Sequence, residues 1–365
     1  MSQSSSPCAC RAVVPGDEGD RLVIRSATSH SLRVMERVAA DGDVEVVRGD
    51  GLLELRGDGL HTLLLELDAA LSGPEAEEAR AVFLPDESPC ERQLLARVLG
   101  ATSLGTLAAR VRYRHLADIC EDESRFYSRY QPLVDLTTHR PIAYEALLRA
   151  RTDGREVPAG DLFGAAAAGG WTNVLDRIGR ETAIQDAAPW LGDHQLFINF
   201  VPTSIYRPEV CLATTIAAAE AHQVDVRQLV FEVVETHRTD DVAHLLSVIG
   251  HYRANGARVA LDDVGSGYAS LSLVAQVEPD IVKLDLELVQ QLPQPTAAAI
   301  CSSIIELSHG IGAEVVAEGI ETEAQADAAL ELGADIGQGW YFGRPALSAE
   351  LAASAAVQRG VAVAG

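Results

Sequence analysis

Lysine is almost missing from this chain of 365 residues. Of its 29 lysine and arginine residues, one is a lysine, Lys283, and the other 28 are arginines. This bias reflects the base composition of the genome, so a lysine at a single position predicts a role that arginine cannot fill, with chance survival as the alternative. An ammonium is a compact charge that can hold a water or a phosphate oxygen where a guanidinium is too broad.

Long apolar runs are missing as well. No stretch of about 18 apolar residues occurs, so the sequence predicts no membrane-spanning helix. The first ten residues, MSQSSSPCAC, lack the charged and then apolar pattern of a secretion signal, and we expect a cytoplasmic protein. The net charge of −24 argues against duplex nucleic acid and anionic membranes as partners.

Cysteine is scarce, and the short C-x-x-C pairs of common zinc sites do not occur. The six cysteines are Cys8, Cys10, Cys90, Cys120, Cys211 and Cys301. The last two lie in apolar helical patterns and are predicted core residues. The first four leave three alternatives open, namely a four-thiolate metal site, a redox pair, or a tail with unrelated core cysteines.

The length is natural for two domains. Residues 1–20 are rich in Ser, Pro and Gly and predict a flexible tail. Residues 21–100 alternate strand and helix patterns in the order β-α-β-β-α-β, which is that of a ferredoxin-like sandwich. Residues 101–124 predict a helical linker. We expect this small α/β domain to regulate the domain that follows.

Residues 125–355 show short apolar segments that alternate with helical stretches. The segments begin at positions 132, 142, 196, 229, 258, 281, 314 and 336. Such alternation over more than 200 residues predicts a β/α barrel. No G-x-G-x-x-G motif follows a strand, which argues against a dinucleotide-binding sheet.

Polar residues end seven of these eight apolar segments. They are Glu145, Asn199, Glu232, Asp262, Asp263, Lys283, Glu318 and Gln338. In a β/α barrel the carboxyl ends of the strands share one mouth, where active sites are built. Carboxylate and amide oxygens suit Mg²⁺ or Mn²⁺. Each residue alone has a simpler explanation as a solvated strand end, a helix cap or a helix start, but these explanations do not account for the periodic set.

The adjacent pair Asp262-Asp263 cannot share one face of a regular strand, because side chains alternate. At a strand end the backbone turns, and both carboxylates can converge on one cation. Gly265 follows directly and allows a sharp turn.

The motifs then match a known family. The matching stretches are YEALLR at 144, INFVP at 198, FEVVE at 231, LDDVGSGYASL at 261, VKLD at 282, VAEGIE at 316 and QGWYFGRP at 338. In order and spacing they resemble the signature of EAL-domain cyclic di-GMP phosphodiesterases, over about residues 126–345. The resemblance implies a modified (β/α)8 TIM-like barrel with one strand reversed and hydrolysis of cyclic di-GMP to linear pGpG.

The resemblance also implies two Mg²⁺ or Mn²⁺ ions. Their ligands would be Glu145, Asn199, Glu232, Asp262 and Asp263, and Asp263 would bridge the ions. An acidic protein that acts on a phosphate ester needs such ions to reduce charge repulsion.

Further roles follow from the same resemblance. Lys283 would hold the attacking water, and Glu318 would be the general base or a ligand of the second ion. Gln338 would support a metal-bound water. Glu321 would fix the loop after Asp263, which would lead to a contact in a homodimer.

Two more positions match substrate contacts of the family. Arg149 would hold a phosphate, and Asp285 would contact a guanine. The chain also departs from the family pattern at Val264, Leu286 and Glu287, which puts loop, substrate or dimer contacts in doubt. A barrel that binds cyclic di-GMP without hydrolysing it is therefore the main rival to the enzyme. No stretch resembles a GGDEF-type cyclase.

Overall fold

The computed structural model describes residues 18–42, 44–49, 51–85, 97, 99–233, 241–265 and 271–358. The chain divides into two compact units. One unit lies within residues 12–123 and 160–175, and the other includes residues 124–159 and the chain from residue 176 onward. The domain boundaries expected at residues 20, 100 and 124 stay predictions.

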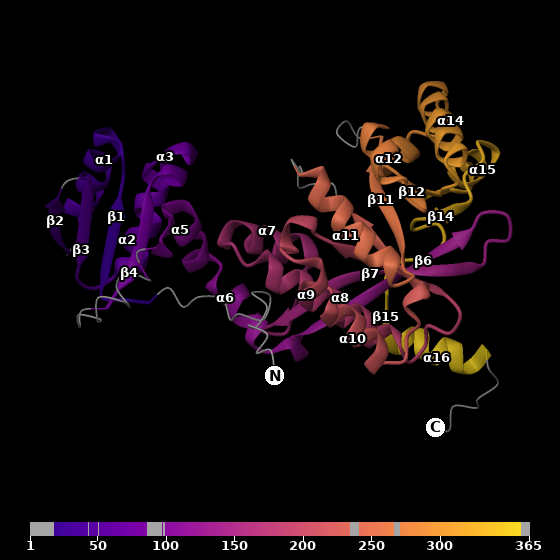
Figure 1. Ribbon diagram of the computed structural model, residues 1–365, viewed down its shortest axis with the longest axis horizontal. Helices are drawn as coiled ribbons and strands as arrows, with labels where there is room; N and C mark the ends of the chain where they lie inside the picture. Colours follow the sequence, from indigo (N-terminus) through magenta and orange to yellow (C-terminus); the bar gives the residue numbers. More distant parts are fainter. Residues whose placement is uncertain are drawn as a thin grey trace. The chain divides into compact units, whose positions relative to one another are not determined.

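The smaller unit is built on an antiparallel sheet. Its strands and helices are β1 (Arg21–Arg25), α1 (Ser29–Ala40), β2 (Glu45–Gly49), β3 (Leu52–Arg56), α2 (Leu60–Ala70), α3 (Gly73–Glu78), β4 (Arg80–Leu84), β5 (Thr102–Ser103), α5 (Leu104–Arg112) and α6 (Arg114–Ala117). The strand order is β2-β3-β1-β4-β5 (Figure 1). The predicted small α/β domain with the order β-α-β-β-α-β is confirmed, and β5 is added at one edge.

Alternation along the strands explains the core of this unit. Leu22 and Ile24 of β1 and Leu53 of β3 are fully buried, because every second side chain of a strand points to the same face. Met35 of α1 and Leu64 of α2 are buried in the same cluster. Helices thus cover one face of the sheet.

The segment predicted as a helical linker contributes to this core. Leu104 and Leu107 of α5 are buried together with the residues of α1 and α2. The side chain of Ser103 caps α5 by accepting a hydrogen bond from the backbone N–H of Thr106. This part of the segment therefore packs with the small α/β unit.

The larger unit carries the alternating strands and helices that the sequence predicted. Its first half contains β6 (Phe126–Asp135), β7 (Pro141–Thr152), β8 (Arg155–Pro158), α7 (Ala159–Gly169), α8 (Thr172–Ala187), β9 (Gln195–Phe200), α9 (Pro208–Cys211), α10 (Ala213–Ala221), β10 (Leu229–Val233) and α11 (Val242–Ala254). Most of α7 and the start of α8 group with the smaller unit. Its second half contains β11 (Arg258–Val264), α12 (Leu271–Val277), β12 (Ile281–Leu284), α13 (Leu286–Gln290), α14 (Pro295–Gly310), β13 (Glu314–Ala317), α15 (Glu323–Glu331), β14 (Ile336–Gln338), β15 (Ala346–Leu347) and α16 (Ser348–Gln358).

Eight of these strands close into a barrel. The order is β6-β14-β13-β12-β11-β10-β9-β7, and pairing between β6 and β7 completes the circle. The strand β6 is antiparallel to both neighbours, whereas the other contacts around the barrel are parallel. This confirms the modified β/α barrel with one reversed strand.

The inside of the barrel has an apolar floor. Each of the eight strands contributes one buried residue to a single cluster: Leu133, Ala143, Phe197, Val230, Ala260, Ile281, Val316 and Ile336. Because side chains on a strand alternate, the residue two positions further along must also point inward. The floor therefore fixes which residues face the barrel mouth. Cys211 and Cys301 are buried in the surrounding core, as predicted.

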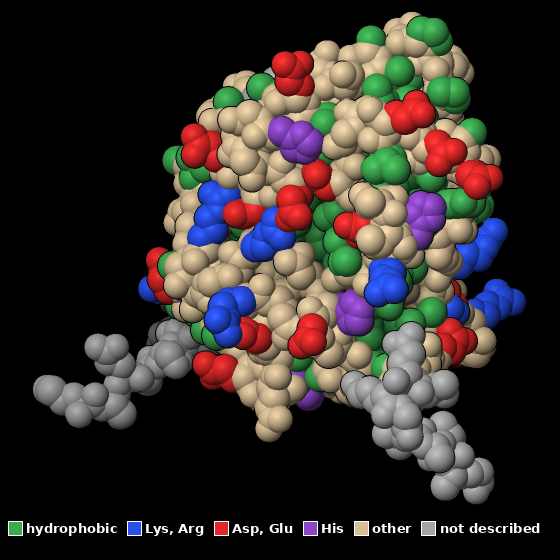
Figure 2. Space-filling model, turned by 90° about the vertical axis from the view of Figure 1, so that its right-hand side faces the viewer, with side chains coloured by type: hydrophobic (Ala, Val, Ile, Leu, Met, Phe, Trp, Pro, Cys, Tyr) green, Lys and Arg blue, Asp and Glu red, His purple; other side chains and the backbone are tan. Residues whose placement is uncertain are grey.

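The described surface carries charges of both signs. On the face shown in Figure 2, acidic side chains lie beside the basic ones, and hydrophobic side chains are scattered between them. This face lacks the continuous basic surface that binding to duplex nucleic acid requires. Within the described residues, no helix has both the length and the apolar character needed to cross a bilayer.

A buried ion pair anchors the end of β9. Asp176 and Arg180 on α8 are 2% and 1% exposed, and the Arg180 Nη2 lies 2.9 Å from the Asp176 Oδ2. The other oxygen of Asp176 accepts a hydrogen bond of 2.8 Å from the backbone N–H of Val201. Val201 follows the last residue of β9, so this contact holds the backbone just beyond Asn199.

The change Asp176→Ala should strongly destabilise the barrel, because it leaves the Arg180 charge buried without its partner. We expect a loss of about 3–5 kcal/mol in the free energy of unfolding, measured as a lower urea midpoint. The control Asp225→Ala removes a carboxylate that pairs with Arg227, whose side chain is 80% exposed, so it should shift the midpoint far less. Equal midpoints for the two variants would contradict the anchoring role.

Candidate active site

A polar layer lies directly above the apolar floor of the barrel. Two positions beyond the floor residue of each strand, toward the mouth, stands a polar side chain: Gln131, Glu145, Asn199, Glu232, Asp262, Lys283, Glu318 and Gln338. Seven of them are residues that the sequence placed at strand ends. The eighth, Gln131, precedes its floor residue in the chain because β6 runs in the opposite direction.

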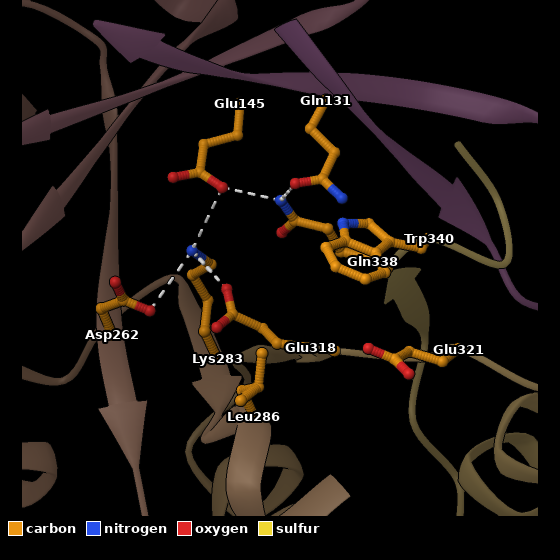
Figure 3. Close-up of a pocket in the computed structure, with 11 residues that line it drawn as sticks. Gln131, Glu145, Asp262, Lys283, Leu286, Glu318, Glu321, Gln338 and Trp340 are labelled. Atoms are coloured by element: carbon orange, nitrogen blue, oxygen red, sulfur yellow. Dashed lines mark hydrogen bonds and ion pairs between the residues drawn. The ribbon is translucent and has the colours of Figure 1, made fainter. Parts of the chain in front are cut away.

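Lys283 lies at the centre of this layer and is 1% exposed. Its ammonium Nζ is 2.5 Å from the Glu318 Oε1 and 2.8 Å from the Glu232 Oε1. It is also 3.2 Å from the Asp262 Oδ1 and 3.9 Å from the Glu145 Oε2 (Figure 3). One lysine therefore contacts carboxylates from four strands or strand ends.

Amide side chains orient Glu145 from two sides. Asn199 donates a hydrogen bond of 2.8 Å to the Glu145 Oε1, and Gln338 donates one of 2.7 Å to the Oε2. The same Gln338 nitrogen lies 3.4 Å from the Gln131 Oε1 (Figure 3). These contacts fix Glu145 although it is buried.

The pKa values of the acidic residues are shifted in different directions, because burial raises each of them and Lys283 opposes it to different extents. Burial raises the pKa of Glu232 well above the usual value, and the neighbouring Glu145 and Asp262 raise it further against the effect of Lys283. Burial likewise raises the pKa of Glu318 to about 8, although Lys283 opposes the shift. In contrast, Lys283 and the two amide donors outweigh burial at Glu145 and lower its pKa. The site thus holds more acidic groups than one lysine can compensate.

A β-bulge brings the two adjacent aspartates together. Leu261 pairs with Val282 and Val264 with Leu284, so β11 has one residue more than β12 over this stretch. Asp263 has a φ of +53°, a left-handed conformation that is uncommon for residues other than glycine. The convergence predicted for a turn after the strand thus occurs on a bulge within β11. Burial and the adjacent Asp262 raise the pKa of Asp263 to about 6.

The residues present fit divalent cations. Ligand oxygens of Asp262, Asp263 and Glu318 lie within 4.8 Å of one another. The Glu232 Oε2 and the Gln338 Oε1 are buried and accept no hydrogen bond from any described residue. Buried oxygens without partners are costly, and a cation would satisfy them. The oxygen donor set is typical of Mg²⁺ or Mn²⁺.

A cavity of about 340 Å³ opens above the polar layer. Its lining residues are Gln131, Glu145, Asp262, Lys283, Leu286, Glu318, Gly319, Glu321, Gln338, Gly339 and Trp340. In Figure 3 the carboxylates of Glu145, Asp262 and Glu318 point toward Lys283, whereas Glu321 lies apart from this group. Glu321 contacts Gln290 of α13 at 3.4 Å. Its predicted role toward the loop after Asp263 concerns residues 266–270, which lie outside the described residues.

The two predicted substrate contacts do not line the cavity. The Arg149 Nη1 donates to the Leu148 backbone oxygen at 2.8 Å, and its Nε lies 3.6 Å from Glu156. Asp285 caps α13 by accepting a hydrogen bond of 3.1 Å from the backbone N–H of Leu288. Both roles stay predictions.

The cysteine hypothesis also stays a prediction. Cys8, Cys10 and Cys90 lie outside the described residues. Cys120 is half-buried in the 3-10 turn Asp118–Glu121, and it forms no disulfide with either of the other two described cysteines.

Sequence reasoning missed Gln131 and Trp340 as lining residues. Gln131 could have been found from its place in the strand 126–135, two positions from Leu133, if the strand reversal had been applied to the count. Trp340 lies two positions beyond Gln338, in the turn after β14. Leu286 was noted as a departure from the family pattern, and the structure places it against Gly319, whose φ is +68°.

Comparison with known proteins identifies the family. The family model for the EAL domain matches residues 114–345. The chain belongs to the EAL domain family.

A relative and a solved structure illustrate the likeness. The probable cyclic di-GMP phosphodiesterase PdeB of Escherichia coli is 31% identical over 59% of this chain and 42% of its own length. The chain thus spans less than half the length of this curated relative. A standalone EAL protein from Vibrio cholerae, solved with cyclic di-GMP bound, is 30% identical, with a TM-score of 0.56 over 61% of this chain and 93% of that one.

A further structure resembles both units of the chain. BlrP1 of Klebsiella pneumoniae, solved with manganese and cyclic di-GMP, covers 90% of this chain and 96% of its own, with a TM-score of 0.56. At 23% identity this likeness shows the fold alone.

Metal ions should raise the melting temperature of the protein, because they compensate buried carboxylates that Lys283 alone does not. At a metal concentration about 100 times the dissociation constant, the gain is about 2.7 kcal/mol, which corresponds to several degrees. Thermal melts with Mg²⁺ or Mn²⁺ against chelator measure it. The change Glu232→Gln should remove most of the rise, and the control Glu181→Gln should keep it. If the wild-type melting temperature is the same in Mg²⁺, in Mn²⁺ and in chelator, the metal site is contradicted.

Proposed function

We propose that this protein is a metal-dependent phosphodiesterase that hydrolyses cyclic di-GMP to linear pGpG. The observation that carries this proposal is the complete polar layer around Lys283, a buried ammonium in contact with four carboxylates. A receptor that only binds the ligand has no chemical need to keep a water-holding lysine and a set of buried acids together. The relatives named as phosphodiesterases support the same reading.

Two Mg²⁺ or Mn²⁺ ions, held by Glu145, Asn199, Glu232, Asp262 and Asp263, would neutralise the substrate charge and lower the pKa of a water. The remaining steps belong to side chains of this chain. Lys283 donates hydrogen bonds from its Nζ to the attacking water and directs it toward the phosphorus. A P–O bond forms with this water as its proton passes to Glu318. The bond from phosphorus to the 3′ oxygen breaks, and that oxygen takes up a proton from solvent and leaves as a hydroxyl.

Glu318 is the proposed general base. It lies 2.5 Å from Lys283, so a water held by the ammonium is within reach of its carboxylate. Gln338 orients Glu145, and Glu321 holds the adjacent segment through Gln290. Arg149 and Asp285 would contact a phosphate and a guanine when substrate enters. We also propose that the protein acts as a homodimer and that its small α/β unit regulates the barrel.

The departures from the family pattern have visible consequences at the site. Val264 is fully buried and pairs with Leu284. Leu286 covers Gly319 at the cavity, where the family pattern has an arginine. A leucine there supplies no charge to a phosphate.

The test of this function is product analysis by chromatography. Purified protein incubated with cyclic di-GMP should form pGpG with Mg²⁺ or Mn²⁺ and none in chelator. The variant Glu145→Ala should form none under either condition while keeping its melting temperature in chelator within a few degrees of wild type. Tight binding of cyclic di-GMP by the wild-type protein without any product would reject the enzyme in favour of a receptor.

The change Lys283→Arg should lower the turnover number by about 100-fold or more, since a misplaced donor costs as much as a missing one. The physical reason is space, because the guanidinium fork cannot occupy the position of an ammonium enclosed by four carboxylates. Steady-state kinetics at saturating substrate measure it, with Arg177→Lys on α8 as the matched control. Near-normal turnover in Lys283→Arg would refute the steric argument.

A further inference from the structure

The ribbon formed by β6 and β7 extends the inward-facing surface beyond the polar layer. Gln131 pairs with Glu145, Arg129 with Leu147 and Tyr127 with Arg149. Paired residues of an antiparallel ladder point to the same face, and every second residue shares it. At about 3.3 Å per residue, Arg129 stands about 7 Å beyond Gln131 toward the mouth. Arginines therefore follow the acidic layer on the same face.

A single carboxylate holds these donors together. The Glu156 Oε2 on β8 accepts hydrogen bonds of 3.0 Å and 2.9 Å from the Nε and Nη2 of Arg129. It also accepts a hydrogen bond from the Tyr127 hydroxyl, and its Oε1 lies 3.6 Å from the Arg149 Nε. Arg151 stacks over the Tyr127 ring with its Cζ 4.3 Å from the ring centroid. Two arginines and one tyrosine thus contact one acid, and a third arginine stacks on the tyrosine.

The donors around Glu156 are suited to bind an oxyanion, and the fold does not require them in this arrangement. Residues 149–152 of β7 pair through their backbones with residues 155–158 of β8. The hairpin therefore does not require the Glu156 side chain to hold it together. Two guanidinium groups and a phenol directed at the same oxygens form the arrangement that recognises phosphate. In this structure the Glu156 carboxylate accepts the contacts that a phosphate would accept.

The contact can also be displaced. The side chains of Glu156 and Arg129 are 36% and 31% exposed, and ion pairs of this exposure contribute about 0–1 kcal/mol. A phosphodiester carries a full negative charge and two oxygens, and it can take the same donors. In a protein of net charge −24 with an acidic cavity below, these arginines are the side chains suited to attract an anion to the mouth.

We propose that Arg129 and Tyr127 extend the phosphate contact expected of Arg149 into a subsite on the ribbon of β6 and β7, beyond the residues that line the cavity, and that Glu156 occupies this subsite until substrate displaces it. The inference rests on the proposed function and deepens it, because it assigns Arg129 and Tyr127 to the second, non-reacting phosphate of a cyclic dinucleotide. The Glu156 carboxylate then competes with the substrate phosphate for the same donors, and this competition raises the Michaelis constant.

The decisive variant is Glu156→Gln, which keeps the shape of the side chain and removes its charge. The KM for cyclic di-GMP should fall by about fivefold, with a smaller change in kcat, because the substrate phosphate no longer competes with a carboxylate. The change Arg129→Gln should raise KM, and in that background Glu156→Gln should lower KM by less. The control Glu181→Gln, on a helix outside the cavity lining, should leave KM unchanged.

The outcomes separate this inference from the function on which it rests. If wild type forms pGpG but Glu156→Gln has an unchanged or higher KM at an unchanged melting temperature, the subsite is rejected and the enzyme stands. If wild type forms no pGpG with either metal, the proposed function fails and the subsite fails with it.

Discussion

A buried lysine among carboxylates is the interaction on which the larger unit depends. Burying several acids inside a barrel is unfavourable unless positive charge accompanies them. Lys283 supplies that charge from a central strand and contacts acids from β7, β10, β11 and the end of β13. It compensates them only in part, and the remaining negative charge makes the layer suited to cations. Lys283 therefore contributes both to the stability of the barrel and to the proposed chemistry.

The barrel geometry explains why these groups meet. An apolar residue from each strand fills the floor, and strand alternation then places the next inward residue of every strand in one layer. All eight positions of that layer hold polar residues. A one-residue slip of any strand would move its member to the outside. The bulge in β11 adds one more ligand, Asp263, at the cost of a left-handed backbone that the surrounding pairing must hold.

Charge changes sign along the inner surface of the same barrel. The polar layer is acidic, and the ribbon of β6 and β7 above it carries arginines held by Glu156. If the proposed dinucleotide substrate enters along this ribbon, the arginines attract its phosphates and the uncompensated acids below repel them. Leu286 contributes no charge at the cavity.

The sequence by itself determined the barrel, its reversed strand through the family motifs, and seven of the eight polar side chains, because a strand end and its polar residue are both local features. It also gave the small α/β order, since amphipathic helices and alternating strands are short-range patterns. Only the tertiary structure decided the rest. Gln131 joins the layer because β6 runs backwards, and Asp262 and Asp263 converge through a bulge that no local pattern marks. Glu156 meets Arg129 across 27 residues of chain because three strands bring them together, and that contact depends on pairing rather than on sequence.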